Sequence, residues 1–239
     1  MTPHTQPRFR RSTVRVPVGD RVLHGDLLVP PRPEGVVLFA HGSGSSRHSP
    51  RNQYVAQELE ERGFAALLID LLTPEEEAVD VHTAEYRFDI ALLTERLVLI
   101  IDWLHAGPAT QAWPIGLFGA STGGAAAIVA ASARPDEVRA VVSRGGRPDL
   151  AGAALSHCAA PTLLIVGGLD HAVLQMNEDA MRRMRGPVAL EIVQGATHLF
   201  EETGALDRVA LLAGDWFARY LPSPAGSAVR RPAAGQTEE

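Results

Sequence analysis

Lysine is absent from this 239-residue sequence, and all 22 basic residues are arginines. A P-loop, a protein kinase and a pyridoxal Schiff base each require a lysine, so the sequence excludes these three kinds of site. Cys158 is the only cysteine, which excludes an intramolecular disulfide and a zinc site built from several thiolates. There is no H-E-x-x-H motif, and the nine histidines show no ligand spacing, so we expect neither a metal nor a cofactor.

The sequence also has little of what marks nucleic-acid-binding or membrane proteins. Its net charge is −6, whereas a nucleic-acid partner calls for a basic face. No stretch reaches the roughly 18 apolar residues of a membrane helix, and the polar residues 1–13 do not resemble a signal peptide. We therefore expect a cytoplasmic monomer or homodimer without nucleic-acid or membrane partners.

Residues 12–221 alternate between apolar, strand-like runs and helix-like segments, which indicates one α/β domain. The runs 12–18 and 22–29 predict a hairpin, and therefore an antiparallel edge. Runs such as 35–40 and 64–70 are largely apolar, which is typical of parallel strands covered on both faces. We expect a mostly parallel central sheet with an antiparallel N-terminal edge and helices on both faces.

The two ends of the chain differ in composition from this domain. Residues 1–11 are polar, and residues 222–239 are rich in Pro, Ala, Gly and Arg. Such segments bury too little apolar surface to offset the entropy of ordering, so we predict disorder at both ends.

The segment Gly119-Ala-Ser-Thr-Gly123 matches the motif G-x-S-x-G. It follows an apolar strand-like run and opens the Ala-rich, helix-like segment 122–133. A tight strand-to-helix turn of this kind holds the serine oxygen clear at the carboxyl edge of a sheet. The motif predicts Ser121 as a nucleophile, and a glycine-rich turn with a helix-capping serine is the structural alternative.

A serine hydroxyl is a poor nucleophile unless a base takes its proton. Asp170 and His198 each follow a predicted strand, so both should lie at the same sheet edge as Ser121, in the order Ser, Asp, His. We assign His198 as the general base and Asp170 as the acid that orients it. Asp149 and Glu201 are rival acids, but one lies a strand too early and the other follows the histidine.

Backbone N–H groups must stabilise the oxyanion that forms in such a reaction. We assign one donor to Thr122, directly after the nucleophile. The second is assigned to Ser43, in the loop that follows the strand ending at Ala40.

These segments together carry a family resemblance. His41-Gly-Ser-Gly44, Gly119-Ala-Ser-Thr-Gly123, Gly168-Leu-Asp170 and Ala196-Thr-His198 resemble the dienelactone-hydrolase-like branch of the α/β-hydrolases, over residues 14–221. The resemblance implies ester or lactone hydrolysis through an acyl-enzyme, without a cofactor. Dienelactone hydrolases proper use a cysteine at the position of Ser121, and this departure favours a more general serine carboxylesterase.

The size of the loops predicts an open site. Only residues 144–161 separate two strands between which lipases often carry a helical lid. The alternative lid position, 71–84, is short, and its acidic part, 73–80, reads as a loop. We expect no large cap domain, which favours small, soluble esters as substrates.

Five basic residues are expected near the catalytic edge: Arg47, His48, Arg51, Arg144 and Arg147. They could form a cationic pocket in which an arginine holds a carboxylate or phosphate on the ester substrate. The structural alternative is ion pairing with Asp or Glu, and the sequence leaves both open.

Three other functions compete with an esterase. A dinucleotide-binding unit would explain a strand, Gly42-Ser-Gly44, a helix and a strand ending at Asp70, but Arg47 stands where the third glycine should be and Pro50 delays the helix. An acyltransferase or perhydrolase would use the same triad. A non-catalytic binding module on the same fold would not need one.

Overall fold

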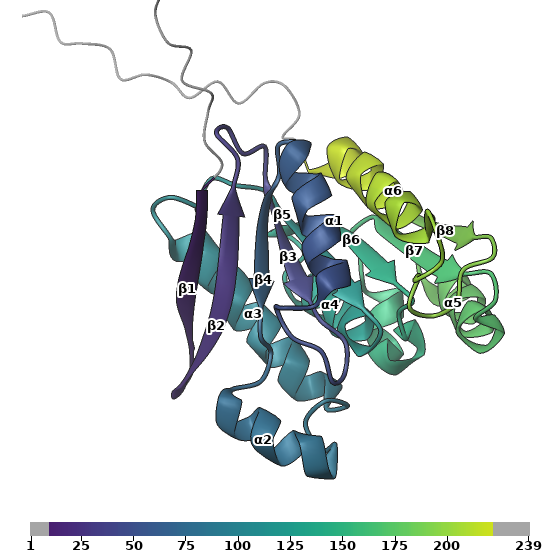
Figure 1. Ribbon diagram of the computed structural model, residues 1–239, viewed down its shortest axis with the longest axis horizontal. Coiled ribbons are helices and arrows are strands. Elements are labelled where there is room, and N and C mark those ends of the chain that lie inside the picture. The colour runs from purple at the N-terminus through teal and green to yellow at the C-terminus, as the bar shows by residue number, and fades with distance from the viewer. Residues whose placement is uncertain (1–9, 222–239) are drawn as a thin grey trace, which may run out of the picture.

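Eight strands form one sheet in the computed structural model, which describes residues 10–221 (Figure 1). The strands are β1 (Arg10–Val18), β2 (Arg21–Val29), β3 (Val36–Ala40), β4 (Ala65–Ile69), β5 (Ile115–Ala120), β6 (Val138–Arg144), β7 (Thr162–Gly167) and β8 (Val188–Val193). The helices are α1 (Pro50–Glu61), α2 (Pro74–Thr83), α3 (Ile90–Ala106), α4 (Thr122–Ala133), α5 (His171–Arg183), α6 (Ala205–Tyr220) and the 3-10 helix η1 (Pro148–Ser156).

The strand order is β1-β2-β4-β3-β5-β6-β7-β8. The pairs β1–β2 and β2–β4 are antiparallel, and every later pair is parallel. The predicted mostly parallel sheet with an antiparallel N-terminal edge is confirmed. The carboxyl ends of β3, β5, β6, β7 and β8 meet at one edge of the sheet, where open α/β sheets bind their ligands.

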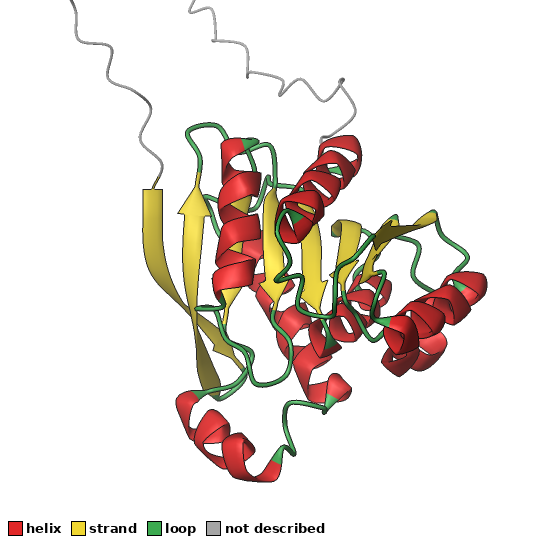
Figure 2. Ribbon diagram, turned by 45° about the vertical axis from the view of Figure 1, so that its right-hand side comes forward, coloured by secondary structure: helices red, strands yellow, loops and turns green. Residues whose placement is uncertain are grey.

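Helices cover both faces of the sheet, as predicted. Helices α1 and α6 lie together on one face, and α3 and α4 lie on the other (Figures 1 and 2). Strand β3 shows how a strand buried on both sides divides its side chains: Val36, Leu38 and Ala40 pack with the α3–α4 layer, whereas Val37 and Phe39 pack with the α1–α6 layer. This alternation explains why the central strands are apolar throughout.

The prediction of an acidic loop over residues 73–80 is wrong, because this segment forms most of helix α2. Thr73 and Glu76 make a reciprocal capping box, in which the side chain of each accepts from the backbone N–H of the other, and Pro74 occupies the first turn. Ala84 is the C-cap residue of α2, and its φ of 57° is left-handed. It is a short helix beyond the sheet edge, and no cap domain is present in the described part of the chain (Figure 1).

The chain enters and leaves the described fold at the same edge of the sheet. Strand β1 begins at Arg10, two residues before the predicted start of the domain. It pairs with β2 at the outer edge of the sheet and runs in the same direction as β4. Helix α6 ends beside Gly35, where an added Cβ would lie 2.8 Å from the side chain of Leu221, just before β3 starts. Both points therefore lie opposite the carboxyl edge (Figure 1). The rest of the predicted disordered ends, residues 1–9 and 222–239, lies outside the described residues.

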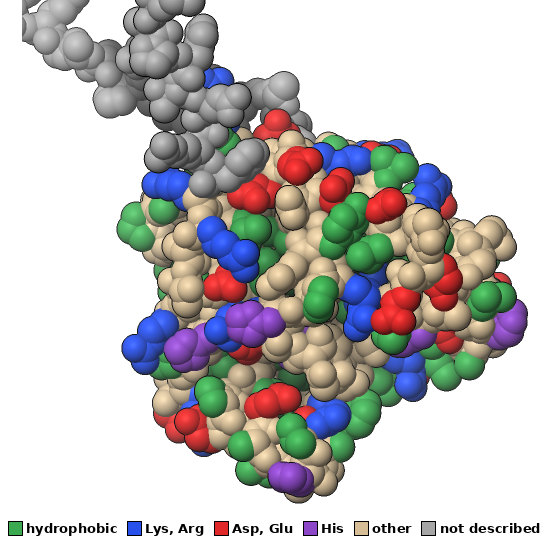
Figure 3. All heavy atoms as spheres, viewed as in Figure 1, with side chains coloured by type: hydrophobic (Ala, Val, Ile, Leu, Met, Phe, Trp, Pro, Cys, Tyr) green, Lys and Arg blue, Asp and Glu red, His purple; other side chains and the backbone are tan. Residues whose placement is uncertain are grey.

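Acidic and basic side chains are interspersed on the face shown in Figure 3, and do not gather into one large patch of either sign. None of the helices between residues 10 and 221 combines the length and the apolar character needed to cross a membrane.

Candidate active site

Ser121 occupies a strained turn between β5 and α4. Its φ of 51° and ψ of −120° are unusual for a residue with a side chain. Its N–H donates to the carbonyl oxygen of Arg144 (3.2 Å), and its own carbonyl oxygen accepts from the N–H groups of Gly124 (3.0 Å) and Arg147 (3.1 Å). Although Ser121 is the N-cap residue of α4, its hydroxyl makes no capping bond. The alternative of a helix-capping serine is therefore wrong.

The two glycines of the motif are required by close backbone contacts. A Cβ on Gly119 would lie 2.4 Å from the carbonyl oxygen of Gly123, and a Cβ on Gly123 would lie 2.2 Å from that of Ala40. Both distances are far below van der Waals contact. The glycines therefore let α4 start directly against β3 and β5, which fixes where Ser121 points.

Asp170 and His198 meet across neighbouring loops at the carboxyl ends of β7 and β8. Nδ1 of His198 donates to Oδ2 of Asp170 at 2.6 Å. Asp170 is the N-cap residue of α5, but its carboxylate makes no capping bond and is turned to the histidine instead. Gly167 allows the two loops to touch, since a Cβ there would lie 2.4 Å from the carbonyl oxygen of Ala196.

One pocket of about 230 Å³ contains both Ser121 and His198 in its lining. Asp170 lies behind the histidine, with only 15% of its side chain exposed, against 40% for His198. The structure thus brings the three predicted residues to one place, although residues 121, 170 and 198 are far apart in sequence. The other lining residues are Gly42, Ser43, Ser45, Ser49, Arg51, Asn52, Ala120, Arg144 and Leu199.

The two predicted oxyanion donors, Ser43 and Thr122, lie close to Ser121. Ser43 lines the pocket, directly after Gly42, where an added Cβ would lie 3.0 Å from Cβ of Ser121. Thr122 is the first residue of α4, and the first N–H groups of a helix have no acceptor within it. Ser43 and Thr122 also line one small adjoining cavity. Their backbone is therefore close to the serine that would bond to the substrate carbonyl, whose oxygen becomes the oxyanion.

His41 positions the loop that contains Ser43, and the sequence did not identify this role. The N–H of Leu71 donates to Nε2 of His41 (2.9 Å), so the ring hydrogen resides on Nδ1, which donates to the carbonyl oxygen of Gly42 (2.9 Å). Burial lowers the pKa of His41 below its ordinary value and keeps the ring neutral. Its place two residues before Ser43 was the available signal, but the partner Leu71 is 30 positions away.

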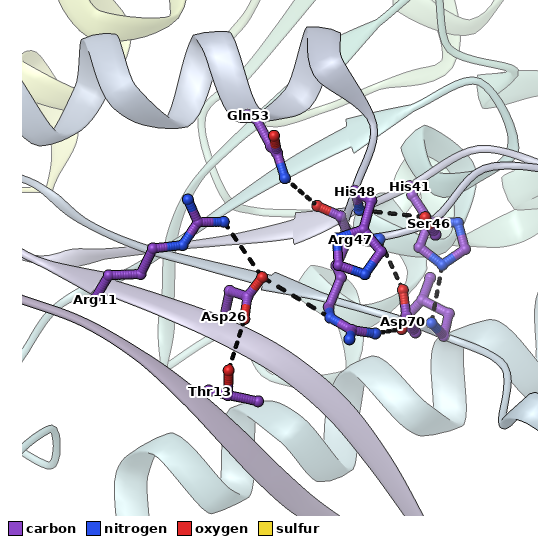
Figure 4. Close-up of polar contacts among 10 residues, drawn as sticks. Arg11, Thr13, Asp26, His41, Ser46, Arg47, His48, Gln53 and Asp70 are labelled. Carbon is purple, nitrogen blue, oxygen red and sulfur yellow. Dashed lines mark hydrogen bonds and ion pairs between the residues drawn. The ribbon is translucent and has the colours of Figure 1, made fainter.

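Three of the five basic residues predicted to bind substrate do not line the pocket. Arg47 forms ion pairs with Asp70 and Asp26 and receives a hydrogen bond from Gln53 on its carbonyl oxygen (Figure 4). His48 is exposed, and its N–H donates to Oγ of Ser46 (3.2 Å). For Arg47, structural ion pairing prevails because two carboxylates surround its guanidinium.

Arg147 is likewise paired with a carboxylate. Its guanidinium donates two hydrogen bonds to Asp149, at 2.9 and 2.8 Å. Asp149 was a rival to Asp170 as the acid that orients the histidine, but its carboxylate accepts these two hydrogen bonds from Arg147.

Arg51 and Arg144 do line the pocket. Arg51 pairs with the exposed carboxylate of Glu201 at 3.0 Å, which accounts for the second rival acid. Arg144 has no ion-pair partner among residues 10–221, and burial, together with the nearby charge of Arg51, lowers the pKa of its guanidinium to about 10.

A second pocket, of about 470 Å³, opens between residues 44–47 and the start of α2. Ser121, Asp170 and His198 are not in its lining, so we locate the candidate active site in the smaller pocket. Among the described residues, no group of three or more His, Cys, Asp or Glu side chains is arranged to hold a metal ion.

Residues 23–219 match the model of the dienelactone hydrolase family. The crystal structure of a dienelactone hydrolase from Anabaena variabilis has a TM-score of 0.88 and 58% sequence identity, over 89% of this chain and 99% of that one. The esterase domain of a Rhodothermus marinus protein has a TM-score of 0.70 over 88% of this chain and 99% of that chain, but at 21% identity it shows the fold alone.

Two Mycobacterium tuberculosis proteins, from the strains CDC 1551 and H37Rv, are 54% identical over 222 residues. Both are named putative phosphoribosyl transferase. The match covers 92% of this chain and 49% of each relative, so the chain spans about half the length of these curated relatives.

The family match covers most of the chain, and the sheet order, the strained serine turn and the absence of a cap in the described residues agree with the predicted α/β-hydrolase fold. The chain belongs to the dienelactone hydrolase family, a family of hydrolases.

Proposed function

We propose that the protein is a serine hydrolase that cleaves small, soluble carboxylic esters or lactones through an acyl-enzyme intermediate. The observation that carries the proposal is the placement of Ser121 and His198 in one pocket, with Nδ1 of His198 2.6 Å from the carboxylate of Asp170. A serine with a strained backbone and an uncapped hydroxyl, beside an oriented histidine, is the arrangement that nucleophilic catalysis requires.

In this mechanism the oxygen of Ser121 attacks the ester carbonyl, while Nε2 of His198 takes its proton. Asp170 accepts from Nδ1–H, which fixes the tautomer that leaves Nε2 free and stabilises the imidazolium as it forms. The N–H groups of Ser43 and Thr122 stabilise the tetrahedral oxyanion. His198 then protonates the leaving alcohol, and a water molecule activated by the same histidine releases the acid and restores Ser121.

The shape of the site favours small substrates. The pocket volume is about 230 Å³, and no cap domain in the described residues adds an apolar tunnel for a long acyl chain. The family match over residues 23–219 supports hydrolysis. The transferase activity in the name of the mycobacterial relatives belongs to proteins twice as long as the matched segment, so we do not extend it to this chain.

We expect the wild type to hydrolyse p-nitrophenyl acetate and butyrate, and Ser121→Ala to lose roughly a factor of 10⁶ in turnover because it removes the nucleophile. Ser156→Ala is the matched control, since Ser156 lies outside the pocket lining, and we expect it to retain wild-type activity. Release of p-nitrophenol measures the rate, and titration of the free acid shows that water is the acceptor. Equal activity of the wild type and Ser121→Ala would contradict the proposal.

A further inference from the structure

Arg144 is a buried cation without an anion. Its relative exposure is 8%, and its Nε and Nη1 atoms are buried without a hydrogen-bond partner in the described part of the chain. The other arginines named around the site behave differently: Arg47, Arg51 and Arg147 each pair with a carboxylate. An unpaired buried charge destabilises a fold, so a residue of this kind is expected where it serves a ligand.

The sheet register places this guanidinium beside the nucleophile. Arg144 is the last residue of β6 and lies opposite Ala120, the residue before Ser121. Its carbonyl oxygen accepts the N–H of Ser121, so the backbones of the two residues are directly connected. Arg144 also lines the same pocket as Ser121 and His198. A group bound by Arg144 would therefore belong to the molecule that reacts with the serine.

Aromatic packing holds the guanidinium in place without neutralising it. The central carbon of the Arg144 guanidinium lies over the ring of Phe200, 5.8 Å from its centroid. Phe200 is buried and has a φ of 57°, a conformation that side-chain-bearing residues rarely adopt. Stacking on a ring leaves the edge of a guanidinium, with its N–H groups, free to bind a planar or tetrahedral anion.

The lining of the pocket contains one arginine more than it has paired with a carboxylate. The two arginines in its lining, Arg51 and Arg144, have one carboxylate between them, that of Glu201, which is 64% exposed and pairs with Arg51. Burial lowers the pKa of Arg144 to about 10, so the group remains charged at neutral pH. A negatively charged group on the substrate would supply the partner that the Arg144 guanidinium lacks among the described residues.

We propose that Arg144 determines specificity by binding an anionic group, a carboxylate or a phosphate, on the ester that Ser121 attacks. This inference rests on the proposed hydrolase function and names its substrate class. The N–H groups of an arginine can donate two parallel hydrogen bonds to either anion. Since the pocket holds about 230 Å³, the anion must lie within a few bonds of the ester.

Matched ester pairs test this proposal. Monoethyl succinate and ethyl butyrate differ by a carboxylate in place of a methyl group, whereas 2-acetoxyethyl phosphate and 2-methoxyethyl acetate differ by a phosphate. We expect the wild type to prefer one anionic ester over its neutral partner by about 10- to 100-fold in kcat/KM, the range for a hydrogen bond to a charged group. The pair that shows the preference identifies the anion.

The variant Arg144→Gln should reduce this preference to about one, because glutamine offers no charge to the anion. Arg147→Gln, three residues further along the chain, is the matched control, since its guanidinium is occupied by Asp149, and we expect it to retain the preference. Equal kcat/KM for both members of both pairs in the wild type, or an unchanged ratio in Arg144→Gln, would overturn the proposal.

Thermal unfolding separates failure of this proposal from failure of the hydrolase function. Free succinate or inorganic phosphate should raise the Tm of the Ser121→Ala variant but not that of the double variant Ser121→Ala/Arg144→Gln. If the wild type hydrolyses no ester but the Tm shift depends on Arg144, the hydrolase proposal fails and the anion site stands. If hydrolysis depends on Ser121 but there is neither an anion preference nor a Tm shift, the hydrolase proposal stands and the anion site fails.

The urea unfolding midpoint of an Arg144 variant distinguishes a ligand-binding role from a purely structural one. Replacing the unpaired cation by an apolar side chain, Arg144→Met, should raise the midpoint of urea unfolding in the absence of anions. A fall in the midpoint would show that the guanidinium stabilises the fold through Phe200, and would count against a ligand-binding role.

Discussion

Position 123 has no room for any residue larger than glycine. A Cβ at this position would lie 2.2 Å from the carbonyl oxygen of Ala40 and 2.7 Å from that of His41. Both atoms are backbone, so neither can rotate away. The side chain would have to push α4 from β3, or the serine turn would have to open.

We therefore expect Gly123→Ala to destabilise the fold by at least about 1–3 kcal/mol, the usual cost of overpacking, and to reduce esterase activity because Ser121 moves. Gly168→Ala is the matched control, since an added Cβ there finds its nearest neighbours at 3.4 Å, an ordinary contact distance. Urea unfolding measures both variants. Equal stability of the two would contradict the steric explanation.

Sequence could predict which residues meet at the candidate site, because each of them follows a strand. Ser121 lies between two glycines at a strand end, and Asp170 and His198 come after later strands in the expected order. Which arginines pair with carboxylates could not be predicted in this way. The partners Asp26 and Asp70 of Arg47 lie more than 20 positions away, and only the folded register shows that Arg47 is neutralised while Arg144 is not.

Helix α2 is fixed to the domain by buried polar contacts, because its apolar side chains, Val79 and Val81 among them, are exposed. Asp80 is completely buried and accepts hydrogen bonds from the backbone N–H groups of Tyr86 and Arg87 and from the Arg87 guanidinium at 2.6 Å. Glu76, near the start of the helix, pairs with Arg96 of α3. These contacts tie both ends of α2 to residues that follow it in the chain.

Removing the charge of Asp80 should therefore loosen α2. Asp80→Asn leaves a partly buried guanidinium without its anion, and we expect a loss of about 2–4 kcal/mol in the free energy of unfolding. Asp102→Asn breaks a pair in which the carboxylate is 45% exposed, and we expect it to cost less than about 1 kcal/mol. Urea unfolding and amide exchange of residues 74–83 check the prediction, and a smaller effect for Asp80 than for Asp102 would refute it.

The elements that could be predicted from sequence are those with strong apolar patterns. The central strands were placed within a residue or two, because a strand covered on both faces has few polar positions. Helix α2 was missed because its acidic residues suggested a solvated loop, although Thr73-Pro-Glu-Glu76 is a capping-box signature. Helix α3 begins at Ile90, directly after Asp89, whose side chain caps its first turn.

At the scale of the whole molecule, several groups with lowered pKa values make the fold less stable as the pH falls. Burial lowers the pKa of His41 below its ordinary value of 6.5. Burial raises the pKa of the Asp80 carboxyl, but hydrogen bonds from Arg87 and Tyr86 outweigh it and leave the pKa below 3.8. In the same way, Arg96 and Thr73 hold the pKa of Glu76 below 4.5. At each of these groups the unfolded chain binds a proton at a higher pH than the folded protein does.

Stability should therefore be greatest near neutral pH and fall as the pH decreases. The first loss is expected just below pH 6.5, where only the unfolded His41 gains a proton, and a steeper one below about pH 4.5, where the carboxylates follow. Urea unfolding at pH 7.5, 5.5 and 4 measures both. His41→Gln should remove the first loss, whereas the exposed His157→Gln should not. A wild-type stability that is flat from pH 7.5 to 5.5 would contradict the assignment.

The described fold begins at Arg10 and ends at Leu221, both at the amino edge of the sheet, while the pocket opens at the carboxyl edge. The molecule therefore keeps its attachment points and its chemistry on opposite sides. A tether, a tag or a neighbouring domain joined at either point would sit behind the sheet. Anchoring the protein to a surface through residue 10 or residue 221 would leave the candidate active site facing the solvent.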